Sequence, residues 1–223
     1  MKKSVIALVL AVLVTGEAFA DFSLSAGGGG YFTSAFGGGY EMSYMGMPLG
    51  IELPFMGSGI FAFIDATYVE ASAGFFFGAI EVKGTGAAIG AINSVKIDFT
   101  SLTLGLLGKF PFRTGEKTAL FPAVGIEYNA VLDAKLQDLS VLFDAGDLSH
   151  LWIKFGGGLD FSLTDRLYLR GTALYGIRFE SKMEKDLVDL IKFSLAYEGV
   201  SGISVDTVLS HGIQLKFALG YKF

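Results

Sequence analysis

The stretch that decides the fold is the end of the chain, where residues 210–223 read SHGIQLKFALGYKF. Apolar side chains occupy one parity of this stretch and small or polar side chains occupy the other, which is the two-residue period of a strand with unlike faces. The sequence ends on an aromatic residue of the apolar parity. That parity comprises Ile213, Leu215, Phe217, Leu219, Tyr221 and Phe223.

The opposite end of the chain carries the pattern of a secretory signal. Two lysines precede an uninterrupted apolar run over residues 5–14, and Ala18 and Ala20 frame a small-x-small cleavage site. The apolar run is too short to span a bilayer as a helix. We therefore expect residues 1–20 to be a signal peptide that is removed after export, and residues 21–223 to form one domain.

The composition favours a membrane barrel over a membrane helix. Hydrophobic residues make up 52% of the chain and charged residues 17%, and there are 31 glycines and no cysteine. After the signal, no apolar stretch reaches the roughly 18 residues that a membrane helix needs. The missing cysteine excludes disulfides and a lipid anchor at a processed cysteine. A formal net charge of −5 argues against a nucleic-acid partner.

Strands with the same alternation recur along the chain. Pro48 and Pro54 weaken the second predicted strand, and Asp65 breaks the parity of the third, as a bulge or a different strand start would. The predicted strands total eight, an even number that suits a bacterial single-chain barrel. They cover residues 22–33, 47–55, 61–79, 100–112, 120–132, 151–163, 167–179 and 210–223.

The predicted connections alternate between short and long. The short ones lie at residues 56–59, 113–118 and 164–166, and the long ones at residues 34–46, 80–99, 134–148 and 181–209. In outer-membrane barrels the short turns face the periplasm and the long loops face outward. The pattern therefore predicts an all-β, eight-stranded antiparallel up-and-down transmembrane barrel with both termini in the periplasm.

A soluble eight-stranded carrier is the alternative fold, because it turns its apolar face inward. The polar parity of this chain carries too few charges to coat a soluble surface, which favours the membrane. Aromatic residues near the predicted periplasmic strand ends fit an interfacial girdle. These are Phe22, Phe55, Phe61, Phe110, Phe112, Phe161, Tyr221 and Phe223.

The polar parity predicts a charge network inside the barrel. Eight strands leave an interior that side chains fill, and charges buried there are expected to pair. Strand positions group the charges into two layers of two acids and two bases, and the alternative is that they line an ion path or gate. Counted from the periplasmic strand ends, the first layer is Glu52, Lys109, Asp160 and Arg170. The next layer is Glu70, Glu127, Lys154 and Lys216, and Arg178 also points inward.

Catalytic, metal and cofactor signals are weak. His150 and His211 both follow a serine, and Asp147 is near in sequence, so a rim-located enzyme is a remote alternative. No spacing suits a metal, and the glycine runs lack the helix and Lys-Ser/Thr pair of a phosphate loop. We therefore expect no catalytic residues, no metal and no cofactor.

The long loops offer a different chemistry. Apolar residues recur at helical spacing near Leu136 and Leu187, which indicates either short amphipathic segments on the barrel rim or a vestibule that collects apolar solutes. Acidic residues outnumber basic ones in these loops. A small hydrophobic solute and an extracellular ligand are both possible partners on this evidence.

The terminal stretch resembles the signal by which outer-membrane barrels are recognised for assembly, carried here by Phe217, Leu219, Tyr221 and Phe223. The whole pattern of signal peptide, strand count, loop asymmetry and terminal Phe resembles the small eight-stranded OmpA-barrel, OmpX and OmpW group. The resemblance implies a monomeric barrel in contact with outer-membrane lipid, the barrel-assembly machinery and periplasmic chaperones. It leaves two functions open: a closed structural or surface-interaction barrel, and an OmpW-like, porin-like conduit for small hydrophobic solutes.

Overall fold

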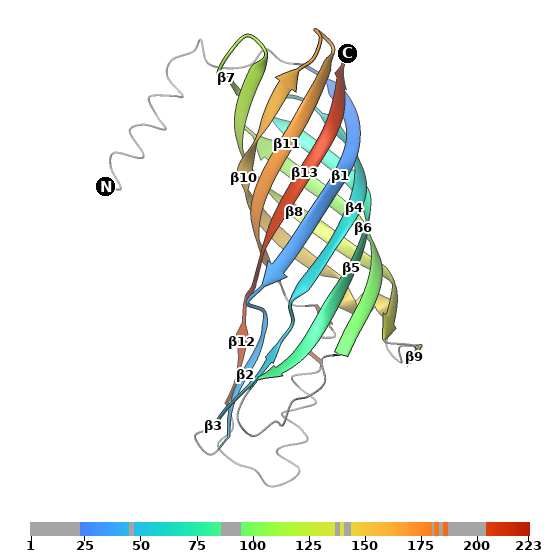
Figure 1. Ribbon diagram of the computed structural model, residues 1–223, viewed down its shortest axis with the longest axis vertical. Helices are drawn as coiled ribbons and strands as arrows, with labels where there is room; N and C mark the ends of the chain where they lie inside the picture. Colours follow the sequence, from blue (N-terminus) through green and yellow to red (C-terminus); the bar gives the residue numbers. More distant parts are fainter. Residues whose placement is uncertain are drawn as a thin grey trace, which may run out of the picture.

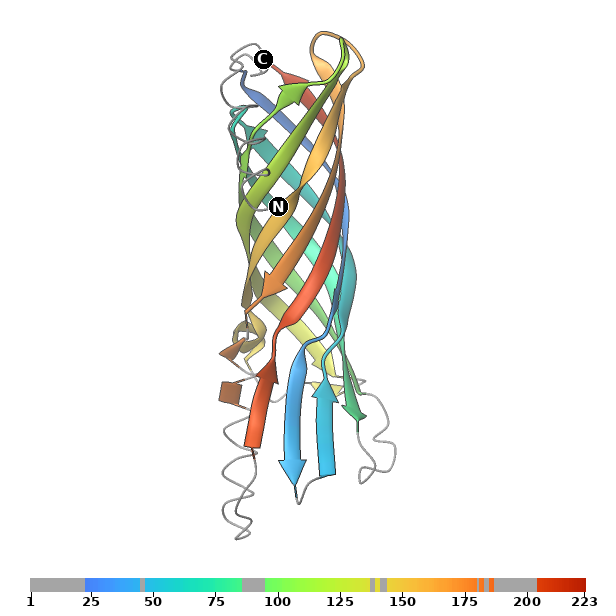
Figure 2. The ribbon, with the colours of Figure 1, turned by 90° about the vertical axis from the view of Figure 1, so that its left-hand side faces the viewer.

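A computed structural model describes residues 23–44, 47–85, 95–136, 139–140, 144–179, 181–182, 185–186 and 204–223. These residues form a closed antiparallel barrel of eight strands, which confirms the predicted fold class (Figures 1 and 2). The wall strands are β1 (Ser25–Phe36), β4 (Phe55–Asp65), β5 (Val69–Thr85), β6 (Val95–Lys109), β8 (Thr118–Leu136), β10 (His150–Ser162), β11 (Leu167–Arg178) and β13 (Ser210–Lys222).

Each wall strand pairs with its sequence neighbours in the barrel, and the last strand closes on the first. Strand β13 pairs with β11 on one side and with β1 on the other, from Ser25 opposite Lys222 to Phe36 opposite His211. Both ends of the chain's barrel portion lie at the end with the short turns (Figure 1). By the general rule for these barrels, that end faces the periplasm.

Three strands extend the sheet beyond the long-loop end of the barrel (Figure 2). Strand β2 (Gly39–Tyr44) pairs with β3 (Met47–Glu52) and with β12 (Ser204–Val208), and β3 joins the outer end of β5. The remaining elements are short. They are β7 (Phe112–Arg113), β9 (Leu139–Ser140) and the 3-10 helix η1 (Ala145–Leu148).

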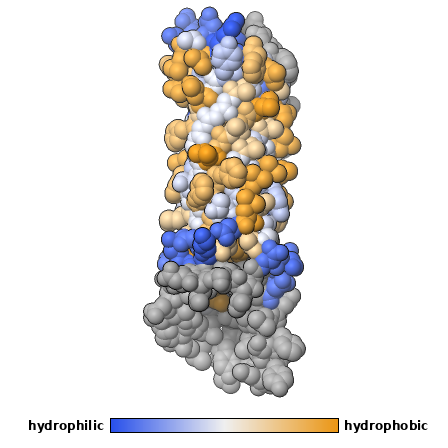
Figure 3. Space-filling view, turned by 90° about the vertical axis from the view of Figure 1, so that its right-hand side faces the viewer, coloured by the Kyte–Doolittle hydropathy of each residue, from blue (hydrophilic) through white to orange (hydrophobic). Residues whose placement is uncertain are grey.

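The wall is inverted relative to a soluble protein. Outward-facing residues such as Leu106 and Ile126 are about half exposed, at 51% and 50%, whereas inward-facing Glu127 and Arg170 are 5% exposed. An apolar band covers the middle of the barrel and hydrophilic residues bound it at both ends (Figure 3). Burying charge and exposing Leu and Phe is stable only where the exterior meets lipid, so the wall strands span a membrane.

No helix in the described ranges is both long and apolar enough to cross a membrane.

The sequence misplaced the second strand. The predicted strand 47–55 is in fact β3, outside the barrel, and the second wall strand is β4, whose residues 56–59 were predicted to form a turn. Glycines led to that prediction, but inside the barrel they make room for rings. A Cβ atom on Gly59 would lie 2.7 Å from the ring of Tyr31.

The true turn between the second and third wall strands lies at residues 66–68. Thr67 adopts a positive φ of 61°, and its hydroxyl accepts a hydrogen bond of 2.7 Å from the Ser23 backbone N–H. The predicted strand 61–79 is therefore two strands, and Asp65 is the last residue of β4. Phe55 and Phe61 consequently point into the lumen, at 3% and 8% exposure, so their assignment to the aromatic girdle was wrong.

Candidate functional site

The part of the lumen near the short-turn end contains a charge cluster centred on one guanidinium group. Arg170 of β11 donates to both oxygens of Asp160, from Nε at 2.7 Å and from Nη2 at 2.6 Å, and to Glu70 from Nη1 at 2.6 Å. Its Nη2 also lies 2.7 Å from Asp65 Oδ2, and Lys109 forms an ion pair with the same oxygen. We call Asp65, Glu70, Lys109, Asp160 and Arg170 the Arg170 cluster.

A second cluster lies closer to the long-loop end of the lumen and is centred on one carboxylate. Lys154 of β10 donates to Glu127 Oε1 at 2.5 Å, and the Lys216 ammonium lies 3.5 Å from Oε2. Gln214 donates to the same carboxylate at 3.3 Å and to Thr33 at 3.2 Å. We call Glu127, Lys154, Gln214 and Lys216 the Glu127 cluster, and all four side chains are buried.

The predicted layers of two acids and two bases need correction. Glu52 lies on β3, exposed and outside the barrel, so its placement in the lumen was wrong. Glu70 belongs to the Arg170 cluster, because Glu70 pairs directly across the sheet with Asp65. The Arg170 cluster thus carries three carboxylates and two cations, and the Glu127 cluster carries one carboxylate and two cations.

The sequence reasoning missed Asp65, which is 3% exposed and contacts both cations of its cluster. A signal for it was present. Its break of parity indicated a different strand start, and a turn after Asp65 restores the alternation.

Aromatic rings occupy the lumen on the outer side of the Glu127 cluster. The Phe55 ring stacks on Phe99 at 5.5 Å between centroids, and it also contacts Phe76 at 5.3 Å and Trp152 at 6.2 Å. We call Phe55, Phe76, Phe99 and Trp152 the aromatic layer. Leu148 of η1, which is 2% exposed, belongs to the same buried apolar cluster, so a long loop contributes to its packing.

Arg178, the last residue predicted for the lumen, does point inward. It is 4% exposed and lies opposite Trp152 in the pairing of β11 with β10. This register places it at the level of Trp152 in the aromatic layer.

A polar cavity of about 660 Å³ opens at the short-turn end of the barrel. Asp160, Tyr168 and Arg170 line it from within, and residues of the periplasmic turns line its rim. The Tyr168 hydroxyl hydrogen-bonds the Ser25 hydroxyl at 2.8 Å. The Arg170 cluster therefore forms the inner boundary of this cavity.

The residues considered for a rim enzyme are engaged in other contacts. His150 Nδ1 lies 3.0 Å from the Leu148 carbonyl oxygen, and its Nε2 lies 3.1 Å from the Asn129 amide. His211 faces outward and lies 2.8 Å from the Tyr175 hydroxyl. Asp147 pairs with Lys182, whose pKa this contact raises. Among the described residues, no group of three His, Asp or Glu side chains is placed to hold a metal ion.

The residues of the predicted assembly signal lie on the outward face of β13. Phe217 and Phe223 are 67% and 77% exposed, and Leu219 and Tyr221 share their face. Arg166 donates to the Tyr221 hydroxyl at 3.0 Å. Their role in assembly stays a prediction, and the predicted cleavage site at Ala18 and Ala20 lies outside the described residues.

These features define the class of the protein. A closed eight-stranded antiparallel barrel with an apolar exterior and a charged interior is an integral β-barrel of the bacterial outer membrane.

Solved structures of similar architecture are small outer-membrane barrels. The chain aligns with the outer membrane protein OprG from Pseudomonas aeruginosa at 12% identity and a TM-score of 0.47, over 93% of this chain and 98% of that one. It aligns with Neisserial surface protein A at 12% identity and a TM-score of 0.35, over 87% and 99%. It aligns with Ail, the attachment invasion locus protein of Yersinia pestis, at 16% identity and a TM-score of 0.32, over 87% of this chain and 99% of that one. No protein-family model and no curated protein matches the sequence.

Proposed function

We propose that this protein is a structural and surface-interacting barrel whose lumen is closed and whose extracellular loops make its contacts. The observation that carries the proposal is the stacking of two buried ion-paired clusters along the lumen axis. Each cluster joins strands that are not neighbours in the wall, since Arg170 of β11 reaches Glu70 of β5, and Lys216 of β13 reaches Glu127 of β8. An ion entering this lumen would have to displace contacts that are costly to break.

Two further observations support a closed lumen. The rings of the aromatic layer contact one another in the outer part of the lumen, and Leu148 belongs to the same buried apolar cluster. In the wall, each described strand pairs along its length with both neighbours, from β5 against β6 over Val69–Val82 to β1 against β13. Paired strands of this kind leave no sideways exit for a solute within the described part of the wall.

Planar-bilayer recording of the refolded protein tests the proposal directly. We expect no stepwise current from the wild-type barrel, and none from the Glu127→Ala variant, because the aromatic layer remains in place. Stepwise current in the wild type would contradict a closed lumen. Current in the variant alone would instead identify the Glu127 cluster as a gate.

An OmpW-like conduit for small hydrophobic solutes is the second candidate, and the aromatic layer is the observation that favours it. Rings such as Phe55 and Trp152 would be a compatible lining for an apolar solute that entered from the outside. Liposome swelling with apolar and polar solutes of equal size separates the two candidates. Entry of apolar solutes alone supports the conduit, and entry of neither supports the closed barrel.

We also propose that the protein is exported with residues 1–20 as a cleaved signal and functions as a monomer. The two lysines, the uninterrupted apolar run over residues 5–14 and the small residues Ala18 and Ala20 motivate the first statement. N-terminal sequencing of the protein purified from outer membranes should begin at Asp21. Any other start beyond residue 20 would refute the cleavage site.

A further inference from the structure

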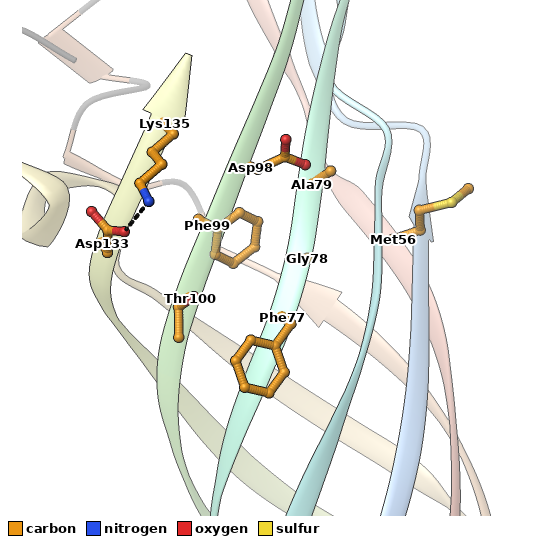
Figure 4. A pocket seen from close by; sticks show the side chains of 9 residues that line it. All are labelled: Met56, Phe77, Gly78, Ala79, Asp98, Phe99, Thr100, Asp133 and Lys135. Carbon is orange, nitrogen blue, oxygen red and sulfur yellow. Dashed lines mark ion pairs between the residues drawn. The ribbon is translucent and has the colours of Figure 1, made fainter. Parts of the chain in front are cut away.

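A groove of about 440 Å³ lies on the outer face of the wall near the long-loop end. It crosses four strands, from Met56 on β4 to Lys135 on β8 (Figure 4). The apolar side chains of Met56, Phe77 and Ala79 line one part, and Asp98, Asp133 and Lys135 line the other. One groove therefore combines an apolar wall with a charged wall.

The strand register explains why the surface is hollow here. Met56 lies opposite Ala79, Ala79 opposite Asp98, and Asp98 opposite Lys135, so these four side chains form one row across the wall. In the adjacent row Phe77 lies opposite Thr100. The short side chains of the middle strands lie between longer ones on either side, which leaves a depression.

A β-bulge turns the charged wall outward. The register of β6 against β8 shifts between Thr100, opposite Asp133, and Ser101, opposite Val131, which leaves Leu132 as the extra residue. Val131 is buried, and Leu132 and Asp133 are both exposed. Without the bulge, strict alternation would send Asp133 and Lys135 into the lumen. Bulges that redirect side chains in this way often serve a site.

The charged groups that line the groove are two carboxylates and one ammonium, and all three are accessible. The Lys135 ammonium lies 3.6 Å from the Asp133 carboxylate. The ammonium of Lys96, two residues before Asp98 on β6, lies 2.9 Å from the Asp98 carboxylate. These side chains are between 55% and 75% exposed, so water and solutes reach both members of each pair. Exposed ion pairs of this kind are weak and can exchange partners with a charged ligand.

We propose that this groove binds one phosphorylated glycolipid of the outer leaflet. The apolar part is continuous with the lipid-facing band of the wall, and Phe77 at 55% exposure belongs to that band, so an acyl chain can lie along it. The Lys135 ammonium then bonds a phosphate oxygen. Asp98 and Asp133 accept from sugar hydroxyls, or bind a divalent cation that bridges to the phosphate. The proposal concerns the outer wall and is independent of a closed lumen.

The test is titration of the full-length barrel, in phosphatidylcholine nanodiscs, with purified lipid A, with bound lipid counted by native mass spectrometry. We expect Lys135→Ala to weaken binding about fivefold, because one basic group near an anionic surface contributes on that order. Ala79→Trp fills the hollow and should weaken it at least as much. Lys182→Ala is the matched control, since Lys182 also pairs with an aspartate but lies in a loop, and its binding should be unchanged.

Dephosphorylated lipid A, titrated against the unaltered protein, gives a second measurement that does not depend on any variant folding. We expect binding about fivefold weaker than for lipid A. Equal binding of the two lipids overturns the proposal. So does lipid A binding as strong as the wild type's in both Lys135→Ala and Ala79→Trp, or a loss in Lys182→Ala as large as the loss in Lys135→Ala. A change in dimer fraction without a change in bound lipid would assign the groove to a second copy and would also overturn it.

Discussion

The two charge clusters of the lumen are built in opposite ways. In the Arg170 cluster one cation reaches three carboxylates, and in the Glu127 cluster one carboxylate reaches two ammonium groups. Their formal charges are therefore −1 and +1, and neutrality holds only across the two clusters together. The difference teaches that a narrow barrel interior need not balance charge level by level, provided that each level has one group that contacts all the groups of opposite charge.

Removing the central cation should have the largest effect. Arg170→Met leaves three carboxylates, two of them buried, with only Lys109, and we expect the free energy of unfolding to fall by about 4 kcal/mol. Urea unfolding of the barrel refolded in phospholipid vesicles measures it. Arg170→Lys keeps the charge without the planar guanidinium, and its free energy of unfolding should lie between those of the wild type and Arg170→Met. A cost below 1 kcal/mol in Arg170→Met would show that the cluster does not depend on its centre.

Removing the central carboxylate should come next. Glu127→Gln leaves Lys154 and Lys216 facing each other, and we expect a loss of about 3 kcal/mol. The loss is smaller than for Arg170 because fewer hydrogen bonds disappear and long lysine chains can move apart. The same unfolding experiment decides. A larger loss than in Arg170→Met would reverse the ranking and the comparison with it.

Removing a surplus charge should cost little. Lys216→Met leaves Glu127 paired with Lys154 alone and keeps an apolar side chain beside the Phe61 ring, over which the Lys216 ammonium lies at 5.1 Å. We expect a change of at most about 1 kcal/mol, since apolar replacements of buried ions are often neutral. A cost equal to that of Glu127→Gln would show that both lysines are needed.

Breaking the exposed pair between Lys182 and Asp147 should have the smallest effect on the free energy of unfolding. The raised pKa of Lys182 means that the pair contributes at pH values below the ordinary lysine pKa and is lost as pH rises through the raised value. We expect Lys182→Ala to leave the unfolding curve at neutral pH almost unchanged. A marked shift of that curve would show that the loops couple to barrel stability.

Much of this structure could be predicted from the sequence, because parity is a local property. Alternation along residues 210–223 and its repeats predicted the fold class, the strand number and an inward-facing set that includes Glu127, Lys154 and Arg170. The comparison between the clusters was not predictable in this way. It depends on register across strands, and the misplaced second strand moved Glu52 into the lumen and left Asp65 out.

The errors have physical causes in particular residues. Gly57 and Gly59 suggested a turn, yet they lie in a strand because rings from neighbouring strands occupy the space of their missing side chains. The turn itself uses Thr67 at positive φ, a residue that gives no turn signal in sequence. The bulge at Leu132 likewise reverses the parity of Asp133 and Lys135, and nothing local marks it.

The chain has a single tryptophan, Trp152, and it is 1% exposed within the aromatic layer. Its intrinsic fluorescence therefore reports the interior of the barrel at the aromatic layer and not the lipid-facing exterior. During refolding into vesicles, a blue shift of its emission should follow closure of the interior, whereas quenchers attached to lipid tails should act on it only weakly. The protein thus carries a built-in optical probe that can time the filling of its lumen separately from insertion into the bilayer.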